Sequence, residues 1–231
     1  MRKLAVFVEG LTEVLLIERI IEELAGPNNV VIEQKRIQGG KSVPVSYTTI
    51  KAHKAITGER FYVLIYDCGG DHQVATRIKK EHVGLDAAGY EKIIGLRDVR
   101  PTFTLADIPK LESGLLNGVA PGLISVEFIL ATMEVEAWFL AEVNHFQLID
   151  PAITPVAISS TLGFDPVTDD LSLRLHPASD LEACYAIGGK SYSKGTPATI
   201  QSLDISNLYL SLRPRIPYLN KLFASMDSFL A

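Results

Sequence analysis

The chain has 231 residues, of which 47% are hydrophobic and 21% are charged, and its formal net charge is -5 at pH 7. These values are ordinary for a globular protein with a sizeable core, and the negative charge argues against binding nucleic acid through the whole surface. Any contact with DNA or RNA is therefore expected at a local patch.

Three features favour a cytoplasmic protein without a membrane segment. The two cysteines, Cys68 and Cys184, are too few for a disulfide framework, which favours a reducing compartment. The first apolar run, Leu4–Val8, is short and stops at Glu9, which is typical of a strand and not of a signal peptide. No uncharged apolar run reaches the roughly 18 residues of a membrane helix.

The first quarter of the chain alternates between predicted strands and helices. A strand over Leu4–Val8 leads into an amphipathic helix over Leu11–Ala25. Asn29–Ile37 is predicted to be a strand, and Val45–Ala55 a helix. Phe61–Tyr66 is continuously apolar, as expected for a central parallel strand that is buried on both faces.

The predicted alternation continues to residue 143. A helix runs from Asp71 to about Val83, Ile93–Leu96 is a strand, and the next helix has Thr104 as its cap. A long strand, Leu123–Met133, and a helix, Glu134–Glu142, complete the series. This order predicts an α/β fold, with a doubly wound, mostly parallel, Rossmann-like sheet and helices on both faces.

After residue 143 the pattern changes. Prolines interrupt a loop-rich stretch at Pro151, Pro155, Pro166 and Pro177. Clear helical sequence returns at Ile216–Leu230. We therefore expect an α/β core over residues 1–143 and a loop-rich, mainly helical extension over residues 144–231, packed on the core as part of one structural unit. The sequence is also compatible with an oligomer.

An acidic residue ends each of four predicted strands: Glu9, Asp67, Asp98 and Glu134, with Glu136 two residues after the last. Parallel α/β sheets bind ligands outside the carboxyl ends of their strands. Carboxylates gathered there repel one another unless a cation joins them. Because oxygen-rich acidic clusters suit Mg²⁺ or Mn²⁺, these positions predict a divalent-metal site.

The acids near the first and third strands also have purely structural interpretations. Glu9 and Glu13 could simply favour the N-terminus of a helix, where carboxylates complement the helix dipole. Asp71 follows two glycines and opens a helix, so it is a good candidate for an N-cap.

The later acids have similar alternatives. Asp98 could pair with Arg97 or Arg100 and stabilise only a turn. Glu134 and Glu136 open a helix, and one of them could face solvent. The shared position of all these acids on the sheet favours the joint interpretation as a site.

Three short segments resemble motifs of one known family. Val8–Glu13, after the opening strand, resembles the glutamate motif of Toprim domains (the topoisomerase–primase fold), and Tyr66-Asp67 resembles the first aspartate of their paired-aspartate motif. Met133–Leu140 resembles the Glu-x-Glu-Ala segment of a Toprim-like family of unknown function, whose members are often encoded beside ATPases in bacterial defence regions. The resemblance covers the core through residue 143 and extends more weakly to Tyr192–Lys194.

The resemblance implies a role for two of the acids. Toprim nucleases hold Mg²⁺ with a glutamate and aspartates for phosphodiester cleavage, so Glu9 would be a metal ligand or base and Asp67 a metal ligand. The second aspartate of the family motif would stand at position 69, where this chain has Gly69. Asp71 follows two residues later and could reach the same metal through the flexible glycine pair.

Two hypotheses of function follow. The first is a Mg²⁺- or Mn²⁺-dependent Toprim-like nuclease that acts in defence against foreign DNA, with Glu9, Asp67 and Asp71 as catalytic metal ligands and Glu134 and Glu136 nearby. Four basic residues are candidates to hold phosphates: Lys41, Arg97, Arg100 and Lys194. The second is a non-catalytic partner or sensor subunit that works with an ATPase, which the missing aspartate and the acidic composition favour.

Overall fold

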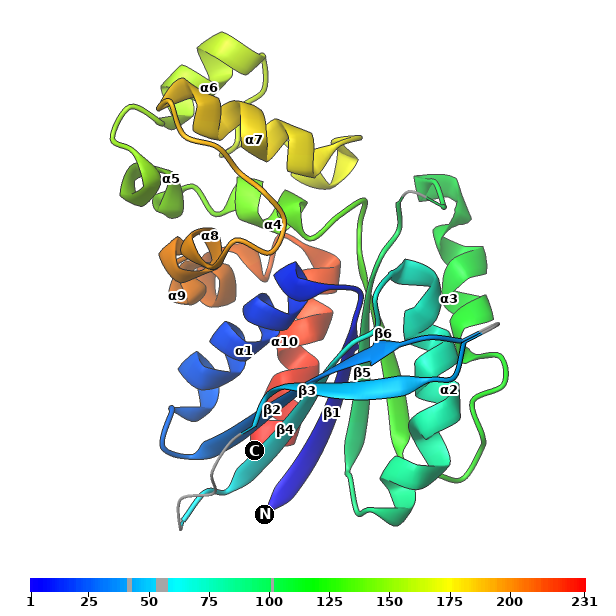
Figure 1. Ribbon diagram of the computed structural model, residues 1–231. Coiled ribbons are helices and arrows are strands. Elements are labelled where there is room, and N and C mark those ends of the chain that lie inside the picture. Colours follow the sequence, from blue (N-terminus) through cyan, green and yellow to red (C-terminus); the bar gives the residue numbers. More distant parts are fainter. Residues whose placement is uncertain (41–42, 53–57, 101) are drawn as a thin grey trace.

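The computed structural model describes residues 1–40, 43–52, 58–100 and 102–231, apart from the side chain of Asp71, and shows an α/β protein (Figure 1). Its described strands form one six-stranded sheet in the order β3-β2-β4-β1-β5-β6. Every neighbouring pair is parallel except β2 and β3, which are antiparallel. The strands are β1 (Arg2–Val8), β2 (Val30–Gln38), β3 (Ser46–Lys51), β4 (Phe61–Asp67), β5 (Lys92–Asp98) and β6 (Ser125–Ala131).

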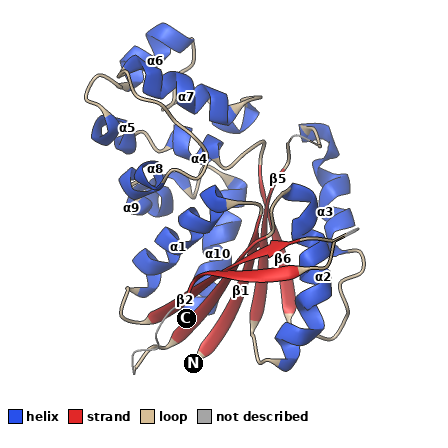
Figure 2. Cartoon of the chain, in the orientation of Figure 1, coloured by secondary structure: helices blue, strands red, loops and turns tan. Residues whose placement is uncertain are grey.

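Four helices cover the two faces of this sheet (Figure 2). On one face lie α1 (Leu11–Ala25) and α10 (Pro217–Leu230), and on the other α2 (Asp71–Ala87) and α3 (Ile108–Leu116). Each face has its own buried apolar cluster, and the strand residues alternate between the two clusters. The central strand β1 is buried on both sides, so the continuous apolar run from Leu4 to Val8 has a packing reason.

The chain after residue 143 divides into two structural roles. Helices α5 (Asn144–Ile149) to α9 (Ile205–Asn207) lie beyond the carboxyl ends of the parallel strands, whereas α10 returns along the sheet and packs on β6 (Figure 1). The ring of Phe229 in α10 lies 5.4 Å from that of Phe61 in β4, and both belong to the apolar cluster that contains α1. Part of the expected extension is therefore a layer of the α/β core.

The remaining helical segments have between 3 and 11 residues. They are α4 (Glu136–Ala141), α5 (Asn144–Ile149), α6 (Pro155–Leu162), α7 (Pro177–Ile187), α8 (Pro197–Ser202) and α9 (Ile205–Asn207), with single turns at Leu105–Asp107, Leu171–Leu173 and Leu208–Leu212. Within the described ranges, no helix combines the length and the apolar character needed to cross a bilayer.

One prediction about the core is wrong. Val45–Ala55 was expected to be a helix, but Ser46–Lys51 is the edge strand β3, paired with β2 from Gln34 to Gln38. Its β-branched residues Thr48, Thr49 and Ile50 favour a strand. Because β3 is exposed along its whole length, no buried face gives its sequence a period of two. Residues 53–57 lie outside the described part of the chain.

Candidate functional site

The carboxyl edge of the sheet brings acidic side chains together. Asp67 and Asp98 are the last residues of β4 and β5, Glu9 directly follows β1, and Glu134 lies in the turn after β6. These four strands are neighbours in the order β4-β1-β5-β6, and the pairs Val8–Asp67 and Asp98–Ala131 end in register. Parallel pairing therefore explains why acids that are far apart in sequence meet at one edge.

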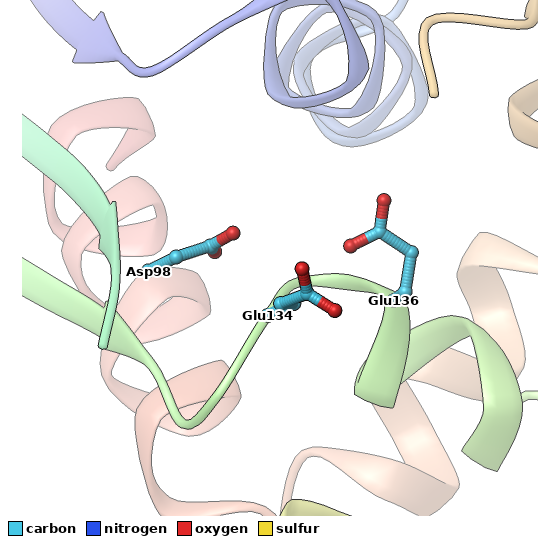
Figure 3. A group of neighbouring side chains, drawn as sticks. All are labelled: Asp98, Glu134 and Glu136. Carbon is cyan, nitrogen blue, oxygen red and sulfur yellow. The ribbon is translucent and has the colours of Figure 1, made fainter. Parts of the chain in front are cut away.

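Asp98, Glu134 and Glu136 form the tightest acidic group in the described part of the chain. One carboxylate oxygen from each lies within 4.8 Å of the others, and Figure 3 shows the three carboxyl groups turned toward a common space. Asp98 is 4% exposed and Glu136 is fully buried. Hard oxygen donors at this spacing, shielded from water, are suited to hold a divalent cation.

A strained turn places Glu134 and Glu136 on the same side. Met133 is buried and has φ 68°, a backbone conformation that residues other than glycine rarely adopt. Its carbonyl accepts a hydrogen bond from the amide of Arg100 at 3.1 Å. The helix α4 consequently starts at Glu136, two residues later than predicted. Strain of this kind is more frequent at functional sites than elsewhere.

Burial and mutual repulsion raise the pKa values of these acids and so disfavour their ionised forms. Burial, followed by the charges of Glu9, Glu13 and Glu136, raises the pKa of Asp98 well above its ordinary value. Burial also raises the pKa of Glu136. The pKa of Glu13 is raised to about 7, mainly by burial and then by Glu136. A bound cation would favour the ionised form of all three carboxyl groups and lower their pKa values.

Lys194 provides a cation at this position. Its Nζ lies 3.0 Å from Oε1 of Glu134 and 3.6 Å from Oε2 of Glu136. Burial lowers the pKa of Lys194, but the charges of Glu136 and Asp98 outweigh burial, and the net effect is a raised pKa. Lys194 comes from the loop between α7 and α8, so the outer helices complete the site.

Two hydrogen bonds hold this loop on the site. The hydroxyl of Tyr192 donates to Oε1 of Glu136 at 2.7 Å, and the amide of Gly195 donates to the hydroxyl of Thr12 at 2.8 Å. Tyr192–Lys194 is the segment that carried the weaker resemblance to Toprim-like proteins. The structure places it against both the start of α1 and the acidic group.

The other acids line an adjoining cavity of about 580 Å³. Oε1 of Glu9 accepts a hydrogen bond from the amide of Asp98 at 2.6 Å. Asp67 accepts from the amide of Gly69 at 3.0 Å, and its other oxygen lies 2.7 Å from Nε of Arg36 on β2. Glu9 and Asp67 thus share one cavity with Asp98 and Lys194, although Asp67 already has a cationic partner.

The structure describes the surroundings of two acids that had structural interpretations. Asp98 faces Glu9 and accepts a hydrogen bond from the amide of Val135 at 3.2 Å, while its expected pairing with Arg97 or Arg100 stays a prediction. The N-cap of α2 is Gly70, so Asp71 is the first helical residue and not the cap. The side chain of Asp71 lies outside the described part, and its expected role as a metal ligand stays a prediction.

The residues expected to bind phosphate do not lie together at the site. Lys194 lines the acidic cavity. Arg97 is 5% exposed, and its guanidinium lies 5.2 Å from the centre of the Phe103 ring, away from the cavity lining. Arg100 is half-buried and joins the turn after β6 through its backbone. Lys41 lies outside the described residues.

Sequence reasoning left three neighbours of the site out of the predicted set: Glu13, Arg36 and Tyr192. Glu13 has a detectable signal, because it lies four residues after Glu9 and its carboxylate accepts a hydrogen bond from the amide of Gly10 at 3.0 Å. Arg36 reaches the site through the strand order, which no local pattern contains. Tyr192 reaches it through the path of the outer loop, and its only sequence signal is the weaker resemblance over Tyr192–Lys194.

Comparisons with known proteins found no matching family, no similar curated protein and no similar solved structure. The functional interpretation of this edge therefore rests on its own geometry and on the motifs quoted above.

Proposed function

We propose that the chain is a Toprim-like nuclease that cleaves phosphodiester bonds with Mg²⁺ or Mn²⁺, and that it acts in defence against foreign DNA. One observation carries the proposal: acids end four neighbouring parallel strands at one edge, and three of their group lie within 4.8 Å of one another. The motif around Glu9 and the aspartate at position 67 support it, because both residues line the adjoining cavity.

The donor set fits a divalent ion. Asp98, Glu134 and Glu136 would hold it through carboxylate oxygens, and the ion would supply an activated water and stabilise charge on the phosphate. Glu9, next to Asp98, would accept a proton from the attacking water.

Lys194 has to release these oxygens before an ion can share them. Its Nζ contacts both Glu134 and Glu136, and half of its side chain is exposed, so the ammonium can turn toward solvent. Once released, it would hold a non-bridging phosphate oxygen as a point charge.

A second function is favoured by the same ion pairs. Arg36 and Lys194 already neutralise part of the acidic edge, and Gly69 stands where the family motif has its second aspartate. A site that supplies its own cations can keep the fold without metal. The alternative is therefore a non-catalytic partner or sensor subunit of an ATPase.

Cleavage assays separate the two functions. Purified protein, alone and with an ATPase encoded beside it, is incubated with labelled DNA and RNA in Mg²⁺, Mn²⁺ or EDTA. We expect cleavage only with metal and its loss in Glu9→Ala and Asp67→Ala, whereas the exposed control Glu182→Ala stays active. A folded wild type that cuts nothing under any of these conditions would support the non-catalytic subunit.

Asp71→Ala gives a further distinction. If Asp71 replaces the second aspartate of the motif, its loss should be as severe as that of Asp67. If Asp71 only complements the dipole of α2, the variant should lose at most about 1 kcal/mol of stability and keep full cleavage.

A further inference from the structure

A second cavity adjoins the acidic one at the same edge of the sheet. It has a volume of about 330 Å³ and lies between the end of β2, the turn after β4 and the first turns of α2. The two cavities share Arg36, Gln38 and Gly69, so they form one continuous depression. The second cavity adds Gln73 and Arg77 from α2, and the lining residues that the structure describes include no acid.

Arg77 is the unusual residue of this cavity. It is only 2% exposed, yet it makes no ion pair with any residue in the described part of the chain. Its Nη2 donates to the carbonyl of Gly39, and its Nε has no hydrogen-bond partner. A buried guanidinium that lacks a direct ion pair and a partner for its Nε is costly, so this side chain favours an anion beside it.

The start of α2 adds to the positive character of the cavity. Its N-cap is Gly70, which has no side chain to satisfy the first amides, and Gly69 and Gln73 line the cavity at this end. Gly69 and Gly70 adopt φ 73° and 140°, so the backbone itself turns around this point. The N-terminus of a helix carries a partial positive charge and binds phosphate readily.

We propose that Arg77, Gln73 and the first turn of α2 form a binding subsite for a phosphate of a nucleic-acid backbone. The subsite rests on the proposed function, because it lies beside the acidic cavity where the neighbouring phosphodiester would react. The nucleic-acid strand would run along the ends of β1, β4 and β2, with Arg36 between the two cavities. Arg77 is thus the predicted phosphate contact, in place of Arg97.

Binding without metal tests the subsite separately from catalysis. Fluorescence anisotropy of a labelled single-stranded oligonucleotide is measured in EDTA for the wild type, Arg77→Gln and Gln73→Glu. The control Lys80→Gln removes an exposed charge from the same helix. We expect about tenfold weaker binding for Arg77→Gln and Gln73→Glu and a small change for Lys80→Gln.

The salt dependence of binding gives an independent readout. Loss of one phosphate contact should reduce the slope of log affinity against log salt by about 0.7 for a single strand. Circular dichroism checks that Arg77→Gln folds, and the half-buried Gln73 provides a second variant if it does not. Equal affinity of the wild type and a folded Arg77→Gln, or an equal loss in Lys80→Gln, would overturn the proposal.

Competition identifies the source of the phosphate. A mononucleotide or inorganic phosphate should displace the oligonucleotide only at far higher concentration than unlabelled oligonucleotide. If a mononucleotide competes as well as the strand, the ligand is a free nucleotide and the nucleic-acid assignment is wrong. A wild type that binds through Arg77 but never cleaves would contradict the nuclease and keep the subsite.

Discussion

Two cations at the carboxyl edge of the sheet differ in how they are held. Arg36 and Asp67 lie on the neighbouring strands β2 and β4 and stand opposite each other in register. Lys194 reaches Glu134 and Glu136 from a loop that contacts the core through few hydrogen bonds. The first cation is fixed by the sheet, whereas the second can leave. A metal ion is therefore expected on the Lys194 side.

The largest effect is expected from Lys194→Met in the absence of metal. Glu136 is fully buried and would lose its cationic neighbour, which should cost about 3 kcal/mol of folding stability. For a chain of this length the melting temperature should fall by roughly 6–12 °C, as measured in EDTA by thermal unfolding. Millimolar Mn²⁺ should restore most of the loss, because the ion replaces the ammonium.

Lys190→Met is the matched control. The side chain of Lys190 is 50% exposed, against 49% for Lys194, but it has only a 3.8 Å pair with Asp150. We expect a change below about 0.5 kcal/mol and no response to metal. If Lys194→Met were as stable as the wild type in EDTA, Glu136 would be protonated and would need no cation. The proposed difference between Lys194 and Arg36 would then be wrong.

The ionisation of Glu13 should make the folding stability depend on pH, and Glu13 lies on the Lys194 side of the site. Its folded pKa of about 7 lies above its ordinary 4.5, so the folded state binds the proton more tightly than the unfolded state. The contribution to stability is present below pH 4.5 and is lost as the pH rises through 7.

Glu13→Gln should remove this dependence. Urea unfolding at pH 5 and pH 7.5 should show a wild type that loses about 2 kcal/mol from this group, and a variant that loses correspondingly less. Glu23→Gln, on the exposed side of α1, should leave the profile unchanged. Parallel profiles for the wild type and Glu13→Gln would mean that Glu13 does not take part in the coupled group.

Among the substitutions in the site itself, Arg36→Met should have the smallest effect. Arg36 is 38% exposed, and Asp67 keeps its hydrogen bond from Gly69, so the loss should be about 1 kcal/mol by thermal unfolding in EDTA. Mn²⁺ should restore a smaller share of the lost stability in Arg36→Met than in Lys194→Met. An equally complete restoration would instead place Asp67 among the metal ligands, as the sequence motif implies.

The sequence was most informative where burial imposes a pattern. The helix Leu11–Ala25 has the predicted bounds because its apolar face packs on the sheet. The acids at the strand ends could be expected at one edge because parallel strands end together. Local patterns failed at the exposed strand β3, where neither face is buried.

Residues that reach the site across the fold were the hardest to predict. Tyr192 and Glu136 are 56 residues apart, and Arg36 and Asp67 are 31 apart, so their contacts depend on strand order and loop path. The four basic residues chosen from the sequence did not include Arg77, because a cation in the middle of a helix looks solvated until its burial is known.

The central claim is that Asp98, Glu134 and Glu136 hold a divalent ion, and Mn²⁺ titration followed by electron paramagnetic resonance of the free ion tests it most directly. We predict one bound Mn²⁺ per chain in the wild type, at least about tenfold weaker binding in Glu136→Gln, and unchanged binding in the exposed control Glu182→Gln. Equal binding in Glu136→Gln, or no binding to the wild type at millimolar Mn²⁺, would contradict the account.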